Sequence, residues 1–242
     1  MRKHLLPLLP LVLMLLLVAC QRVEDSQADK AASAAKAQAE KAQAEEASQA
    51  PDKPEAPDGC SPAFRALFDH AVVELHGEGD LDVVVATDPL CWHCRLAHKL
   101  LGEYPELYGR LRYLFFPRRS FIGSDMAAWV LEDSAGTARL GKMVDYAYTD
   151  LKQPKTDDLM TARMIVLTQF TQVFPGLLDG TTMADLYVRL QREHEPHVDE
   201  GAAMARKLEL PGTPVLVGGD RVVLGFGPGV WLKTLGAAKM CK

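Results

Sequence analysis

The chain has 242 residues, hydrophobic residues at 48% of its positions and a formal net charge of −5. This length suggests one or two domains, and the composition is apolar enough for a sizeable core. The sequence contains no basic run or basic stripe, which argues against nucleic acid as a partner.

The first twenty residues have the pattern of a secretory signal peptide. Two positive residues precede an apolar run over residues 5–18, which is too short for a membrane-spanning helix of about 20 residues. The run ends in Leu17-Val18-Ala19-Cys20, which resembles the lipobox of bacterial lipoproteins. This resemblance implies cleavage before Cys20 and a lipid on its sulfur. We therefore predict a lipoprotein signal peptide over residues 1–19.

A lipid on Cys20 would tether the mature chain to a membrane, because buried acyl chains bind bilayers strongly. We expect a protein of the bacterial cell envelope that faces the periplasm. Gln21, rather than aspartate, follows the cysteine and favours the outer membrane. Residues 20–58 are rich in Ala, Gln, Glu and Lys and, from Glu24 onward, lack the large apolar residues that a core needs. We interpret them as the lipidated N-terminus and a solvated spacer.

Residues 59–242 are predicted to form one α/β domain. Apolar and β-branched patterns predict strands over 72–75, 81–86 and 111–116, a helix over about 91–103, a hairpin over 215–224 and a last helix over about 229–240. The strand over 81–86 is apolar on both faces, so we expect it at the centre of the sheet. Residues from about 124 to 208 have helical periodicity instead. This order fits a thioredoxin-like fold with an inserted helical domain.

The segment Cys91-Trp92-His93-Cys94 is the predicted redox site. It lies where an apolar strand ends and a helix begins, so Cys91 meets the unpaired N–H groups and the positive end of the helix dipole. Both favour the thiolate, the form that attacks disulfides. The spacing keeps Cys94 within reach to resolve a mixed disulfide. His93 adds a polar, potentially cationic neighbour that would stabilise the thiolate further.

Other uses of a C-x-x-C pair fit this chain less well. A structural disulfide across two residues is strained, and a c-type haem site requires histidine where this chain has Arg95. Zinc needs two more ligands, and His98 is the only local candidate. A periplasmic copper-binding chaperone that uses Cys91, Cys94 and His98 stays open as the alternative function. The simpler interpretation of His98 is a solvated surface side chain.

Two motifs together resemble the DsbA-like thiol–disulfide oxidoreductases. The first is Asp88-Pro89-Leu90-Cys91-Trp92-His93-Cys94-Arg95, and the second is Gly212-Thr213-Pro214-Val215. The resemblance implies a cis peptide bond before Pro214. It also implies that Thr213 and Pro214 help to seat the substrate chain, and we expect Trp92 beside the cysteines to bind substrate as well. The distance between the motifs leaves room for the helical domain that interrupts the thioredoxin fold in this family.

The chain departs from the family pattern at two positions. Trp92 replaces the proline that is frequent between the two cysteines. Thioredoxin-like proteins often have a buried acid six residues before the first cysteine, and here that position is Val85. The nearest acid is Asp88, which we expect at the end of the strand. The acid that often assists proton transfer in such proteins is therefore missing at position 85.

The remaining cysteines and histidines are assigned structural roles. Cys60 and Cys241 lie at the two ends of the globular domain and are predicted to form a structural disulfide, with two unpaired thiols as the alternative. His194 and His197 flank a proline that is expected to open a helix, which would leave both histidines on the surface. We expect no metal site there.

The resulting expectation is a membrane-anchored oxidoreductase that needs no cofactor. Cys91 would exchange with the substrate, Cys94 would resolve the mixed disulfide and His93 would tune the thiolate. The expected partners are exported proteins with thiols or disulfides and a membrane redox partner. His93 before Cys94 favours oxidation of substrates over reduction.

Overall fold

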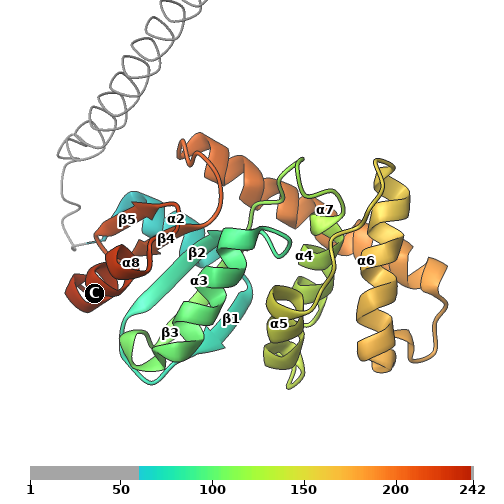
Figure 1. Cartoon of the computed structure of the whole chain (residues 1–242), viewed down its shortest axis with the longest axis horizontal. Helices are drawn as coiled ribbons and strands as arrows, with labels where there is room; N and C mark the ends of the chain where they lie inside the picture. Colours follow the sequence, from blue (N-terminus) through green and yellow to red (C-terminus); the bar gives the residue numbers. More distant parts are fainter. Residues whose placement is uncertain (1–59, 241–242) are drawn as a thin grey trace, which may run out of the picture. The chain divides into compact units, whose positions relative to one another are not determined.

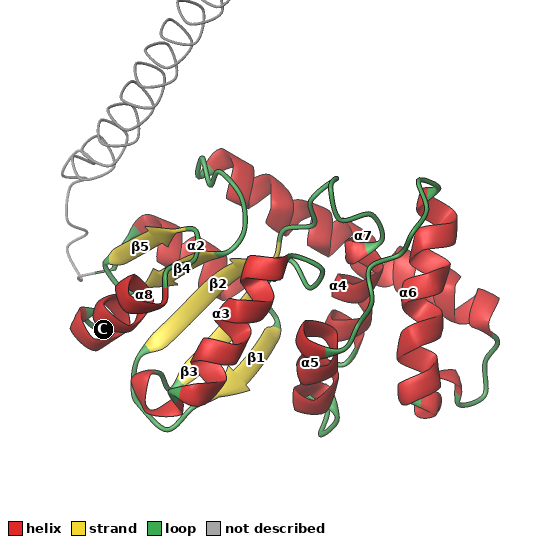
Figure 2. Ribbon diagram, viewed as in Figure 1, coloured by secondary structure: helices red, strands yellow, loops and turns green. Residues whose placement is uncertain are grey.

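The fold is built around one mixed sheet, in a computed structural model that describes residues 60–240 (Figures 1 and 2). The strands are β1 (Val73–His76), β2 (Asp82–Thr87), β3 (Arg110–Phe115), β4 (Val215–Gly218) and β5 (Arg221–Leu224), in the order β1-β3-β2-β4-β5. Only the β2–β3 pair is parallel. The strand that is apolar on both faces is β2, and its central position is confirmed.

Helices cover both faces of the sheet (Figure 1). Those outside the insertion are α2 (Pro62–His70), α3 (Trp92–Glu103), the short η1 (Pro105–Leu107) and α8 (Pro228–Ala237). Val83 and Val85 of β2 belong to the same buried cluster as α3 and α8, whereas Val84 and Ala86 belong to the cluster of α2. Alternate side chains of β2 therefore enter two separate cores, which explains its continuous apolar run.

Between β3 and β4 the chain forms a bundle of helices. They are α4 (Ser124–Asp133), α5 (Leu140–Thr149), α6 (Leu159–Val173), η2 (Pro175–Leu178) and α7 (Met183–Lys207). The other long helices of the bundle pack around α4, and its Trp129 is 1% exposed. The predicted α/β class with an inserted helical domain is confirmed.

The long helix α7 belongs to both parts of the fold. It packs against α4 and α6 inside the bundle and against α2 and β3 beside the sheet (Figure 1). Pro196 lies inside this helix, so the prediction that it opens a helix is wrong. Contacts with both the bundle and the sheet side of the fold keep the helix continuous, although the proline removes one backbone hydrogen-bond donor.

Three further observations concern the ends of the described region. The helix α2 was not among the predicted elements, and its N-cap Ser61 accepts a hydrogen bond from the backbone N–H of Phe64 at 3.0 Å. The last helix ends at Ala237, three residues before the predicted end. The predicted signal peptide, the lipidation site Cys20 and the spacer lie outside the described residues. Within residues 60–240, the structure has no helix with the length and apolarity to span a membrane.

Candidate active site

The first turn of α3 holds both cysteines of the predicted redox pair. Cys91 is the N-cap residue, and its backbone N–H donates to the carbonyl oxygen of Asp88 at 3.0 Å. Cys94 lies one turn further along. Both are free thiols, with exposed fractions of 5% and 1%. Cys91 therefore meets the helix N-terminus that its sequence position predicts.

The two thiols differ strongly in acidity. A hydrogen bond from the Cys94 side chain, together with the backbone N–H groups of Cys94 and His93 and the side chain of Thr213, outweighs burial and lowers the pKa of Cys91 to about 5. Burial and the neighbouring Cys91 raise the pKa of Cys94 far above that of a free thiol. At neutral pH, Cys91 is thus mostly thiolate and Cys94 is a thiol.

The second motif lies directly beside the cysteines. The peptide bond between Thr213 and Pro214 is cis, as the family resemblance implies. Cys91 Sγ lies 3.7 Å from the carbonyl oxygen of Thr213, although 122 positions separate the two residues in sequence. The fold therefore brings the C-x-x-C turn and the cis-proline loop together at one site.

The two residues between the cysteines both point outward. The Trp92 side chain is 67% exposed, and His93 is also exposed. The contribution of His93 to the Cys91 thiolate comes from its backbone N–H. The side chain that the sequence suggested as a tuning group is therefore not among the principal causes of the lowered pKa.

Asp88 is the buried acid of the site, with an exposed fraction of 0%. Its Oδ1 accepts from the N–H of Leu90 at 2.9 Å, and its Oδ2 accepts from the N–H of Arg118 at 2.8 Å and the hydroxyl of Ser124 at 3.0 Å. Burial outweighs these three bonds and raises the pKa of Asp88 to about 7, with a smaller contribution from Cys91. One carboxyl group therefore links the turn before Cys91 to the loop and helix that enter the bundle.

A second polar group lies behind Cys94. Burial raises the pKa of Cys94, and the side chain of Thr87, at the end of β2, acts against this and lowers it. The Thr87 hydroxyl is also hydrogen-bonded to Tyr148 of α5, with 2.9 Å between the oxygens. The sequence analysis missed Thr87 and Tyr148. The position of Thr87 next to Asp88, at the end of the active-site strand, is a sequence signal for Thr87. Tyr148 has no such signal.

His98 is mostly covered by neighbouring side chains, so the prediction of a solvated surface position is wrong. Its side chain is 11% exposed. Nδ1 lies 2.8 Å from the hydroxyl of Tyr113, and Nε2 lies 3.1 Å from a carboxylate oxygen of Asp145. Both ring nitrogens therefore have protein partners. This arrangement does not favour His98 as a ligand for a metal held by the two cysteines.

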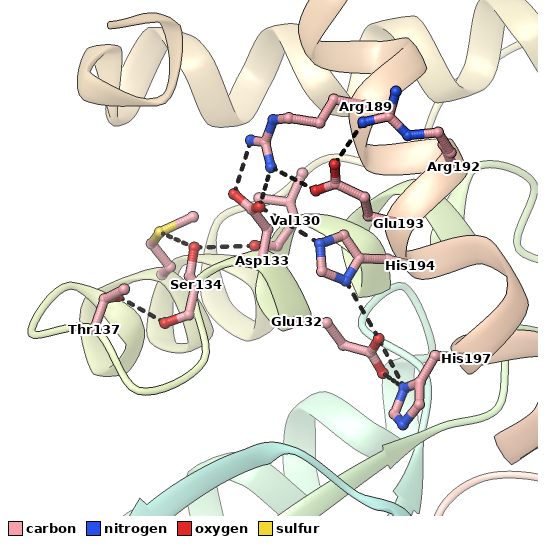
Figure 3. Close-up of polar contacts among 11 residues, drawn as sticks. Val130, Glu132, Asp133, Ser134, Thr137, Arg189, Arg192, Glu193, His194 and His197 are labelled. Atoms are coloured by element: carbon pink, nitrogen blue, oxygen red, sulfur yellow. Dashed lines mark hydrogen bonds and ion pairs between the residues drawn. The ribbon is translucent and has the colours of Figure 1, made fainter.

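His194 and His197 are partly exposed, with side-chain exposed fractions of 19% and 32%, so they are less open to solvent than predicted. Figure 3 shows them at the contact between α4 and α7, facing Glu132. His197 Nδ1 lies 3.0 Å from the Glu132 carboxylate, and His194 lies 3.4 Å from Asp133. Although burial opposes it, hydrogen bonds with Asp133 and Glu132 raise the pKa of His194 to about 9. These charged groups hold the two helices together.

Part of this cluster has the residue types of a metal site. The potential ligand atoms of Asp133, Glu193 and His194 lie within 4.8 Å of one another, the single such group in the described part of the chain. Arg189 pairs with both carboxylates (Figure 3). The guanidinium already supplies the positive charge that a cation would bring, so the cluster is an ion-pair network.

Cys60 lies at the start of the described region, is 1% exposed and is disulfide-bonded. Its predicted partner, Cys241, lies outside the described residues. The pairing of these two cysteines therefore stays a prediction.

Known proteins resemble this chain in structure. No protein-family model and no curated protein sequence matches it. Among solved structures, a thioredoxin-like oxidoreductase from Silicibacter pomeroyi DSS-3 is 25% identical, with a TM-score of 0.52 over 71% of this chain and 94% of that one. Oxidised BdbD from Bacillus subtilis is 16% identical, with a TM-score of 0.52 over 70% and 92%. A variant of alpha-DsbA1 from Wolbachia pipientis is 11% identical, with a TM-score of 0.50 over 69% and 89%.

These three solved structures each cover about seven tenths of this chain and nearly all of their own length. The chain therefore has the DsbA-like form of the thioredoxin fold, with a helical domain inserted between β3 and β4.

Proposed function

We propose that this chain is a thiol–disulfide oxidoreductase that exchanges disulfides with exported envelope proteins. The observation that carries the proposal is the environment of Cys91. Its sulfur lies at the N-terminus of α3, beside the cis bond of Thr213 and Pro214, with a pKa of about 5. A thiol with this pKa is mostly thiolate at neutral pH and is ready for exchange.

In the oxidising direction, a substrate thiolate attacks Cys91 of the Cys91–Cys94 disulfide, and Cys94 leaves. A second substrate thiol then attacks the mixed disulfide and releases Cys91 as a thiolate. The substrate departs with a new disulfide, and the protein keeps two electrons and becomes the dithiol. In this proposal the substrate chain contacts the backbone of Thr213, which lies beside Cys91, and the exposed ring of Trp92.

The acidity of Cys91 favours this direction. Its pKa of about 5 is two units below neutral pH. Those two units stabilise the dithiol form by about 2.7 kcal/mol. At roughly 30 mV per 1.4 kcal/mol, this makes the pair about 60 mV more oxidising than one with an unperturbed thiol. Oxidation of substrates is therefore the proposed role.

The proposal includes the location and the partners of the protein. A lipid on Cys20 would hold it at a membrane, with the domain in the periplasm and a membrane redox partner to regenerate the disulfide. Metabolic labelling with a fatty acid should mark the unaltered chain and leave the Cys20→Ser variant unlabelled. Equal labelling of both would refute the anchor and leave the exchange activity untouched.

The reduction potential tests the exchange function and its direction. We expect equilibration with glutathione to give a potential well above about −270 mV, the thioredoxin value. A value near or below −270 mV would refute the oxidase role. The Cys91→Ser variant should lose all exchange with a reduced peptide substrate, and retained activity would refute the assignment of Cys91.

A further inference from the structure

The buried hydroxyl groups of Thr87 and Tyr148 are hydrogen-bonded to each other near the resolving cysteine, Cys94. Thr87 is 1% exposed and Tyr148 is 2% exposed. Their oxygens lie 2.9 Å apart, Tyr148 belongs to the same buried cluster as Cys94, and the Thr87 side chain interacts electrostatically with that of Cys94. The three side chains come from β2, α5 and α3, so the fold joins the insertion to the thioredoxin part at this point.

The chemistry of Cys94 requires a partner of this kind. In each exchange cycle this sulfur either attacks or leaves as a thiolate, yet it is 1% exposed. A buried anion without a hydrogen-bond donor is costly. Val85 occupies the position where related folds often have an acid, and it is 2% exposed within the sheet core. The carboxyl group of Asp88 already accepts three hydrogen bonds from other groups.

We infer that Thr87 and Tyr148 stabilise the thiolate of Cys94 and take the place of the missing acid. In this inference the Thr87 hydroxyl donates to the reacting sulfur, and Tyr148 is a positioning residue that acts through Thr87. This inference rests on the proposed function. It assigns to the inserted helical domain, through α5, a part in the exchange reaction itself.

The bonding can follow the sulfur through the cycle because a hydroxyl both donates and accepts. When Cys94 is a thiolate, Tyr148 donates to Thr87 and Thr87 donates to the sulfur. When Cys94 is a thiol, it donates to Thr87, and Thr87 donates to Tyr148. Hydrogen bonds in such a chain strengthen one another, and no buried carboxylate is needed.

The step that this affects is resolution of the mixed disulfide. Cys94 attacks the sulfur of Cys91, a new Cys91–Cys94 bond forms, and the bond from Cys91 to the bound thiol breaks. The proton of Cys94 ends on the departing thiol. The protein is oxidised by two electrons, and the bound group is reduced. Loss of the hydrogen bond to the Cys94 thiolate slows this step.

The buried aromatic cluster provides a matched control. Tyr113 is also 2% exposed, and its ring lies 5.3 Å from that of Tyr148. Its hydroxyl is bonded to His98 at 2.8 Å rather than to Thr87. His98 in turn stacks on Tyr148, with 4.9 Å between ring centroids. Replacement of either tyrosine by phenylalanine removes one buried hydroxyl from the same cluster. Only Tyr148→Phe removes a hydrogen bond to Thr87.

The test uses the reduced protein and the aromatic disulfide DTNB in a stopped-flow instrument. The first equivalent of coloured thiol reports attack by Cys91, and the second reports resolution by Cys94. We expect Tyr148→Phe and Thr87→Val to slow the second phase by about 3- to 10-fold. Loss of the hydrogen bond lowers the thiolate fraction of Cys94, and this loss is partly offset because a thiolate of higher pKa is a stronger nucleophile. The pH midpoint of that phase should also rise.

The first phase should be unchanged in both variants, and Tyr113→Phe should resolve at the original rate. If Tyr148→Phe resolves no more slowly than Tyr113→Phe, with the first phase intact, the inference is overturned and the proposed function stands. If Cys91 of the unaltered protein fails to react in the first phase, the proposed function itself fails. Because Tyr148→Phe keeps the ring in the core, it answers the question even where Thr87→Val does not fold.

Discussion

The hydrogen bond between the two thiols is the largest contribution to the acidity of Cys91, and it can be removed by Cys94→Ala. A hydrogen bond to a charged acceptor contributes about 1.5–3 kcal/mol, which corresponds to about one to two pKa units. We therefore expect the pKa of Cys91 to rise from about 5 to about 6–7 in this variant. At pH 6, the thiolate fraction would fall from about 90% to half or less.

The assay is a pH titration of thiolate absorbance at 240 nm, checked by the rate of alkylation with iodoacetamide. The matched control is Cys94→Ser, whose hydroxyl can still donate to the Cys91 sulfur, so its titration should stay closer to that of the unaltered protein. If the alanine and serine variants both titrate near 5, the Cys94 side chain does not stabilise the thiolate. The backbone N–H groups at the start of α3 would then account for the acidity alone.

Three further predictions concern stability and the disulfide. Protonated Asp88 stabilises the fold in full below about pH 4, and this stabilisation is lost as the pH rises through about 7. Asp88→Asn should therefore flatten the dependence of the unfolding free energy, measured in urea, on pH over that range. An unchanged slope would contradict this prediction. Protonated His194 stabilises the fold in full below about pH 6.5, and this stabilisation is lost as the pH rises through about 9. His194→Gln should therefore cost most stability at pH 6 and least at pH 9.5. Parallel curves of unfolding free energy against pH for the variant and the unaltered protein would show that the charge of His194 is irrelevant. Peptide mapping without reductant should yield Cys60 and Cys241 as one linked pair, and separate alkylation of the two would reject that disulfide.

The sequence predicted the parts of the active site that lie within short motifs. Cys91 and Cys94 occur together, and the cis-proline loop has a recognisable tetrapeptide around Thr213 and Pro214. A strand that is apolar on both faces also carries its own evidence of a central position, as β2 demonstrates. These features depend on near neighbours in the chain, which a sequence displays directly.

The remaining features depend on contacts between distant segments. Tyr148 meets Thr87 across 61 positions, and Ser124 meets Asp88 across 36. His98 shares a helix face with Cys94, which spacing indicates, but its burial depends on α5 packing against α3. No local pattern reports that a helix from the insertion will cover this face.

Two helices illustrate the same limit. Pro196 is a reasonable helix start by local preference, but packing of α7 on both parts of the fold carries the helix through it. In contrast, α2 had the local signals of a helix, with Ser61 as N-cap and Pro62 in its first turn. The start of α2 is therefore predictable from its local sequence.

The course of α7 has a mechanical consequence. One end of this helix lies in the bundle, and the other lies against the back of the sheet, so it behaves as a beam that crosses the joint between them. A rotation of the bundle relative to the sheet has to bend that beam or shift it along the sheet. The helix is weakest at Pro196, because proline lacks the backbone N–H that would donate one hydrogen bond of the helix. Bending between the bundle and the sheet is therefore concentrated at this proline.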